Sequence, residues 1–163
     1  LLEAISSQAI SSIREFGAQD LGSPAWSFAA LGLRDTPLLN ALSSSALPNI
    51  SEFSTQGISN TAWSFAALKF SDGPLLDALS SAAIAKMQAF GAQEIANTAW
   101  ALATLQLWHM PLLAAISSSA LSTMTEFGTQ GIANIVWSLA TLGVVDAPLL
   151  YSLSAAARAP LLS

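Results

Sequence analysis

An asparagine three residues before a tryptophan recurs in three stretches, NTAW at 60–63, NTAW at 97–100 and NIVW at 134–137. A carboxamide offers two hydrogen-bond donors and one acceptor oxygen, and an indole offers a flat apolar surface. Rows of such side chains suit the backbone of an extended peptide, or the edges and faces of bases in single-stranded RNA. The pair therefore predicts a binding strip.

A helical wheel places a further small polar position beside each asparagine, and a fourth copy carries serine in the asparagine position. The predicted strip contains Asn60, Asn97, Asn134, Ser23, Ser27, Ser64, Ser138, Trp26, Trp63, Trp100 and Trp137. The alternative is structural: each tryptophan packs between repeats, and each asparagine bonds to the backbone of the next repeat. Recurring aromatic residues at helical spacing are more often core, and both interpretations stay open.

A glutamine lies four residues before each of these asparagine or serine positions. The four are Gln19, Gln56, Gln93 and Gln130. They would contact a ligand or, as we favour, bond back to free N–H groups at the start of a helix or to a neighbouring loop.

The residues needed for catalysis are sparse. His109 is the single histidine, there is no cysteine, and the many serines lack a nucleophile elbow or a recurring acid pair. One histidine cannot build a metal site, and no glycine-rich phosphate loop is present. We therefore expect no enzyme activity, no metal, no cofactor and no small-molecule substrate.

The elements that position the strip repeat every 37 residues. This offset links the four strip tryptophans, and also Phe16, Phe53, Phe90 and Phe127, and Pro37, Pro74, Pro111 and Pro148. Self-similarity at such a period is typical of stacked repeats. Within the second copy, the apolar spacing predicts one helix over 56–69 and a second over 74–88.

Local signals mark the ends of these helices. Gly32 and Gly143 follow the first helix, as a left-handed C′ residue does. Asp35, Asp72 and Asp146 stand two residues before a proline, which predicts the start of the second helix. The second helix carries an apolar stripe at Leu75, Leu79, Ala83 and Met87.

Each unit is thus a helical hairpin that buries its apolar faces by stacking on its neighbours. We predict an all-α fold, an α-solenoid of about four repeats and nine helices. Its predicted parts are 1–15 (the second helix of a preceding repeat), 16–52, 53–89, 90–126 and 127–163. Neither end has the polar face of a capping repeat, so we expect a segment of a longer array in one solenoid domain, 1–163.

Charge argues against a polyanionic ligand. Charged residues make up 9% of the chain, the net charge is −5, and the predicted strip holds no lysine or arginine. Non-specific affinity for nucleic acid comes from such cations. The most hydrophobic window, 95–116, is interrupted by Asn97, Gln106, His109 and Pro111, so we expect no membrane span.

The stretch GAQEIANTAWALATLQL at 91–107 resembles the octotricopeptide and heptatricopeptide helical repeats of algal and dinoflagellate organellar proteins. The matching elements are Phe-x-x-Gln, Asn three residues before Trp, Ala-Leu-Ala-x-Leu and Pro-Leu-Leu. The resemblance covers the whole chain. It implies an organellar protein, with the chloroplast favoured over the mitochondrion, and often an RNA-binding factor for transcript stability, translation or ribosome assembly.

These observations favour a non-catalytic scaffold or accessory subunit that binds protein partners, the subunits of a larger organellar assembly. A plastid photosynthetic complex and an organellar ribosome are the two assemblies we consider. The alternative is a single-stranded RNA-binding factor for organellar RNA processing, stability or translation. Low surface charge and the absence of cations on the strip favour the first.

Overall fold

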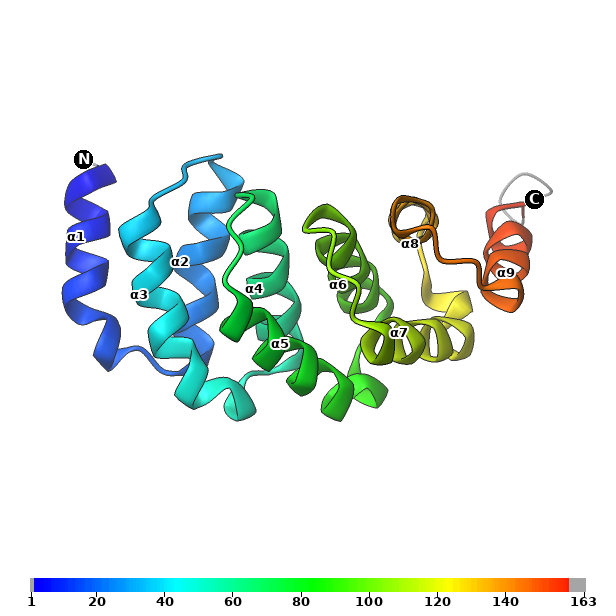
Figure 1. Cartoon of the computed structure of the whole chain (residues 1–163), viewed down its shortest axis with the longest axis horizontal. Helices are drawn as coiled ribbons and strands as arrows, with labels where there is room; N and C mark the ends of the chain where they lie inside the picture. Colours follow the sequence, from blue (N-terminus) through cyan, green and yellow to red (C-terminus); the bar gives the residue numbers. More distant parts are fainter. Residues whose placement is uncertain (1, 159–163) are drawn as a thin grey trace.

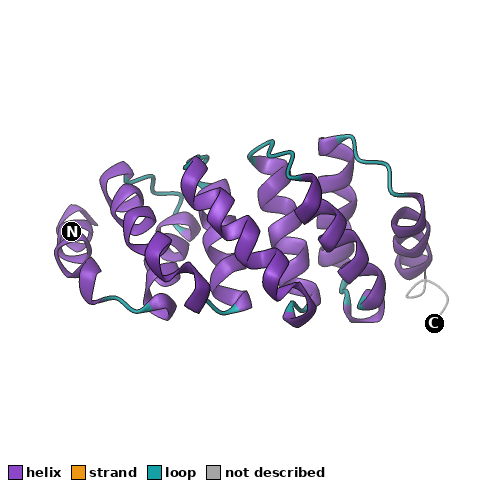
Figure 2. Cartoon of the chain, turned by 60° about the horizontal axis from the view of Figure 1, so that its bottom comes forward, coloured by secondary structure: helices purple, strands orange, loops and turns teal. Residues whose placement is uncertain are grey.

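The computed structural model describes residues 2–158, without the side chains of residues 2, 3, 14 and 18–20. Nine α-helices and four short 3-10 segments follow one another in this range, and it contains no strand (Figure 2). The α-helices are α1 Leu2–Ser12, α2 Ala18–Ala30, α3 Thr36–Ala46, α4 Thr55–Ala67, α5 Gly73–Lys86, α6 Ala92–Thr104, α7 Met110–Ser122, α8 Thr129–Leu142 and α9 Ala147–Arg158. The 3-10 segments are Ile13–Glu15, Leu47–Glu52, Met87–Ala89 and Met124–Glu126. The predicted all-α repeat fold with nine helices is confirmed; residues 159–163 of the predicted last repeat lie outside the described residues.

The helices form two layers (Figure 1). The first helices of the hairpins, α2, α4, α6 and α8, contact one another over much of their length, whereas the second helices, α3, α5, α7 and α9, are splayed apart. A stack that is more tightly spaced in one layer bends toward that layer, so the first helices lie on the inner side of the curve. Figure 1 also shows the helix axes turning progressively from α1 to α9, as in a superhelix.

The second helices begin at side-chain caps. The carboxylates of Asp35, Asp72 and Asp146 accept from the backbone N–H three residues later, at 2.9, 3.0 and 2.9 Å. His109 replaces the acid in the third hairpin, and its Nδ1 accepts from Leu112 N–H at 3.2 Å. The predicted helix starts are therefore confirmed, and the single histidine serves as a cap.

The same caps join neighbouring hairpins. The second oxygen of Asp72 accepts from Ser43 Oγ on α3 at 2.6 Å, and Asp146 accepts in the same way from Ser117 on α7. Ser43 and Ser117 are buried. Each of these two carboxylates thus caps its own second helix and also hydrogen-bonds to the preceding second helix, with which its own helix has few other contacts.

The first helices end in a left-handed residue at the same position in every repeat. Gly32 and Gly143 have φ values of 67° and 63°, as predicted, and Lys69 and Gln106 adopt 51° and 54°. After each of them, a backbone N–H returns to the carbonyl five residues earlier at 2.8–2.9 Å, for example Phe70 N–H to Phe65 O. This is the Schellman arrangement, and it turns the chain toward the second helix.

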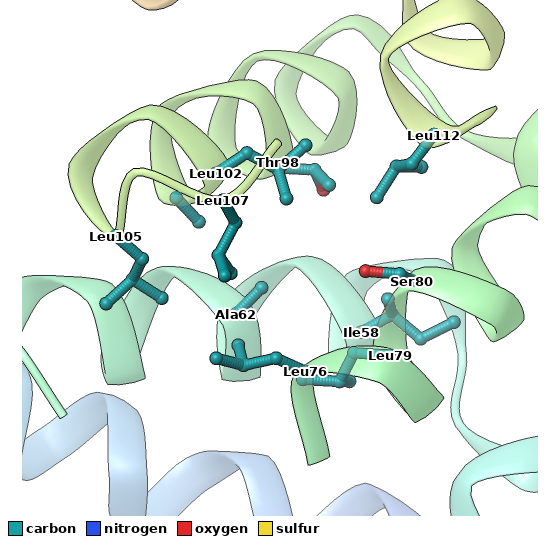
Figure 3. Close-up of a pocket in the computed structure, with 11 residues that line it drawn as sticks. Ile58, Ala62, Leu76, Leu79, Ser80, Thr98, Leu102, Leu105, Leu107 and Leu112 are labelled. Atoms are coloured by element: carbon teal, nitrogen blue, oxygen red, sulfur yellow. The ribbon is translucent and has the colours of Figure 1, made fainter. Parts of the chain in front are cut away.

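The core runs between the layers from one repeat to the next. The predicted stripe of Leu75, Leu79, Ala83 and Met87, which runs along α5 into the following 3-10 segment, is buried throughout. Between the second and third repeats, side chains of α4, α5, α6 and α7 surround a gap of about 20 Å³ (Figure 3). Its walls are almost wholly apolar, and a buried water needs several polar partners, so we read the gap as a packing defect. No helix within residues 2–158 combines the length and hydropathy needed to cross a bilayer.

Candidate functional site

Each inner first helix has a single free side. In α4, neighbouring first helices cover two sides and α5 covers a third, which leaves residues 56, 60, 63 and 67 facing outward. The spacing of four, three and four residues places them in one row along the helix. We call the equivalents of positions 56, 60 and 63 on all first helices the ladder face. Its described members are Gln56, Gln93 and Gln130; Ser23, Asn60, Asn97 and Asn134; and Trp26, Trp63, Trp100 and Trp137.

Trp63, Trp100 and Trp137 form a stack at the surface. The ring centroids of Trp63 and Trp100 are 6.0 Å apart with planes at 32°, and those of Trp100 and Trp137 are 6.3 Å apart at 29°. Trp26 and Trp137 are about half exposed, at 49% and 46%, and the other two are half-buried. The rings therefore touch between repeats, as the structural interpretation expects, yet they also present open surface.

The amides of the ladder face are not used by the fold. Asn60, Asn97 and Asn134 are half-buried, and their side chains make no hydrogen bond to the described residues. Gln56, Gln93 and Gln130 are exposed and likewise have no such bond, which argues against the capping role that we favoured for the glutamines. The side chain of Gln19 lies outside the described residues. These glutamines recur every 37 residues, and each lies four residues before an asparagine, on the same side of its helix. This spacing is the signal that could have added them to the predicted strip.

Two predicted strip residues lie below the surface. Ser64 and Ser138 are buried, and their hydroxyls donate to the carbonyls of Asn60 and Asn134 at 2.6 Å. The prediction that they face the strip is wrong, because the preceding first helix covers that side of α4 and α8. Ser27 is exposed, since no first helix precedes α2 in the described chain.

Two grooves open along the ladder face. A groove of about 680 Å³ lies between α2 and α4, and it is lined by Gly22, Ser23, Trp26, Ser27, Ser54, Gln56, Gly57 and Asn60. A second groove of about 360 Å³ lies between α6 and α8, lined by Ala92, Gln93, Ala96, Asn97, Glu126, Phe127, Gly128, Gln130, Gly131 and Asn134. Gly57 and Gly131 hold the same position in the repeat, which Glu94 fills in α6. Both grooves therefore combine free amides with a glycine-lined wall.

Cations are engaged elsewhere or lie away from this face. The ammonium group of Lys86 donates to the carbonyls of Ser51 and Phe53 at 2.7 and 2.6 Å. The guanidinium of Arg34 lies 5.8 Å from the ring centroid of Phe70, and Lys69 lies beyond the far end of α4.

Carboxylates, in contrast, lie near the starts of the first helices. They are Glu15, Glu52, Glu94 and Glu126, and within the described residues none of them forms an ion pair. A helix N-terminus favours such charges. The ladder face is therefore neutral to acidic. No group of three or more histidine or acidic side chains in the described residues is placed to hold a metal ion.

Comparison with known families gives a match over nearly the whole chain. A family model described as RNA-editing substrate-binding complex 6 protein matches residues 1–161. No curated protein matches the chain. The match supports a helical family related to RNA processing, and it does not single out octotricopeptide repeats.

Proposed function

The chain belongs to the family of RNA-editing substrate-binding complex 6 proteins, and we propose that it is a non-catalytic subunit of an RNA-processing assembly that binds a protein partner along its ladder face. The family description names a multi-subunit complex. The observation that carries the proposal is the row of free amides and stacked indoles on a face without a described cation. Such a row offers donors, acceptors and apolar area to a polypeptide.

Charge favours a protein partner over direct contact with RNA. Electrostatic affinity for RNA comes from lysine and arginine side chains that neutralise phosphates, and the chain carries five such residues against ten acidic ones. Lys86 and Arg34 are held by groups of the fold itself. A peptide backbone, in contrast, is neutral and presents the N–H and C=O groups that a carboxamide matches.

Single-stranded RNA is the second candidate, and the indole stack and the family description favour it. Bases could stack on the exposed ring surfaces, but this face holds no described lysine or arginine to neutralise the backbone phosphates. This weakens the RNA alternative.

The proposed role includes no chemical step. An organellar location, with the chloroplast favoured, and a photosynthetic or ribosomal assembly stay predictions from the sequence resemblance. The family match bears on neither.

The proposal is tested by removing the exposed glutamines, which the fold does not use. The triple variant Gln56→Ala, Gln93→Ala, Gln130→Ala is compared with Ser44→Ala, Ser81→Ala, Ser118→Ala, whose sites are exposed on the outer second helices. Each variant is purified from cells with its assembly, with and without nuclease. We expect the glutamine variant to lose protein subunits in both conditions, and the serine variant to keep them.

Loss of RNA alone, or loss of all subunits from the wild type after nuclease treatment, would overturn the proposal in favour of the RNA alternative. Equal subunit content in both triple variants would show that the partner binds another face.

A further inference from the structure

We infer that the ladder face takes an extended segment of the protein partner whose arginine or lysine side chains lie on the indoles and against Glu126. This inference rests on the proposed function and names the chemistry of the partner. Two independent observations support it: the spacing of the rings and the sign of the charges.

The ring spacing fits an extended chain. Side chains on one face of a β-like segment repeat every two residues, at about 6.4–6.8 Å. The indole centroids repeat at 6.0 and 6.3 Å along α4, α6 and α8. Alternate side chains of an extended segment therefore meet successive tryptophans, while the backbone between them lies within reach of the free asparagine and glutamine amides.

The charges of the face fit a cationic segment. Glu126 is the only charged residue lining the groove between α6 and α8, and it is exposed and has no described ion-pair partner. Glu15, Glu52 and Glu94 add a carboxylate near the start of each other first helix. Tryptophan is the aromatic side chain that attracts a guanidinium or ammonium group most strongly. Arginine side chains on the indoles would gain this cation–π contact, and a further one in the groove between α6 and α8 would gain an ion pair with Glu126.

The ring stack sets the distance between two anchoring side chains. Trp63 and Trp137 lie two repeats apart, and the ring of Trp100 between them is 6.0 Å from the first and 6.3 Å from the second. Because alternate side chains of the segment meet successive rings, the side chains on Trp63 and Trp137 are about four residues apart in the segment.

The test uses the 163-residue chain and a fluorescein-labelled extended peptide of serine, threonine and valine with two arginines about four residues apart. A matched peptide carries citrulline, which keeps the shape of arginine without its charge. We expect the arginine peptide to bind about tenfold more tightly by fluorescence anisotropy, because two cation–π contacts are lost with citrulline. Its binding should quench the tryptophan fluorescence and weaken as salt rises.

Two variants locate the contact. Glu126→Gln should weaken binding of the arginine peptide about threefold and reduce its salt dependence, whereas Asp77→Asn, an exposed acid on α5, should change neither. Trp137→Leu should weaken binding and lower the quenching, and its folded content is checked by circular dichroism.

The outcomes separate this inference from the proposed function. Equal affinity for the two peptides, or equal effects of Glu126→Gln and Asp77→Asn, would overturn the cationic partner and leave the ladder-dependent loss of protein subunits standing. Salt-sensitive binding of an oligouridylate that Trp137→Leu abolishes would overturn both.

Discussion

The first-helix layer and the second-helix layer solve the same stacking problem in different ways. The helices α2, α4, α6 and α8 pack closely along their lengths, and the polar side chains of their free face are left without partners. The helices α3, α5, α7 and α9 are splayed, and polar bridges join some of them: Asp72 caps α5 and accepts from Ser43 on α3, and Asp146 accepts from Ser117 on α7.

This difference indicates where the repeat has freedom to bind. Dense apolar packing stabilises the inner layer without help from its surface amides, so their type and position can serve a partner. In the thinly packed outer layer, the capping carboxylates and the serines that they bridge carry structural bonds, so a change at these residues lowers stability. The predictions below test that division, in decreasing order of effect on stability.

The largest effect is expected from breaking the dense packing. Phe65 on α4 is fully buried and lies edge-on to Phe70, with ring centroids 5.6 Å apart. Phe65→Ala should lower the free energy of unfolding by about 3–5 kcal/mol, because it leaves a cavity. Leu31→Ala, at a residue that is 65% exposed, should cost about 0.5 kcal/mol or less. Urea unfolding followed by circular dichroism measures both, and similar values would contradict the dense inner packing.

The second effect comes from the polar bridge of the outer layer. Asp72→Ala removes both the cap of α5 and the acceptor of the buried Ser43 hydroxyl. We expect a loss of about 2 kcal/mol, as the sum of a cap and one charge-assisted hydrogen bond. Asp77→Ala, an exposed acid on the same helix, is the control. If the two variants unfold at the same urea concentration, the bridge contributes nothing.

The third prediction concerns the hairpin whose second helix is capped by a histidine instead of an aspartate. His109 caps α7 with one nitrogen, and Ser80, at the position of Ser43, is buried with no bond to His109. His109→Asp should stabilise the chain by about 1 kcal/mol, since a carboxylate can serve the cap and accept from Ser80 at once. Thermal unfolding would show a raised midpoint; a lowered one would show that the third loop has adapted to histidine.

The smallest effect concerns the turn between the layers. Lys69 adopts a positive φ where Gly143 does so in the last repeat. Lys69→Gly should gain about 0.5 kcal/mol, and Gly143→Ala should lose about 1 kcal/mol, because a side chain is strained in the left-handed region. Denaturant midpoints of the two variants should shift in opposite directions, and shifts of the same sign would contradict the shared turn.

Local signals predicted the helices well. The Asp-x-Pro starts and the left-handed glycine ends act within a few residues, so the structure has them where the sequence places them. Lys69 and Gln106 were not recognised as turn residues, because neither type favours the left-handed region; only their 37-residue register with Gly32 and Gly143 could have shown it.

The sequence by itself determined the period, the two-helix unit, and the alignment of Asn60, Asn97 and Asn134 in one row, because a repeat without insertions places equivalent residues in equivalent positions. Only the tertiary structure decided which side of each first helix is free. A helical wheel gives the direction of Ser64 around α4, but its burial depends on the neighbouring helix α2, which covers that side. Ser27, at the same position of α2, is exposed because no first helix precedes α2 in the described chain. The stacking of the indoles across repeats depends in the same way on the distance between helices, which no single repeat contains.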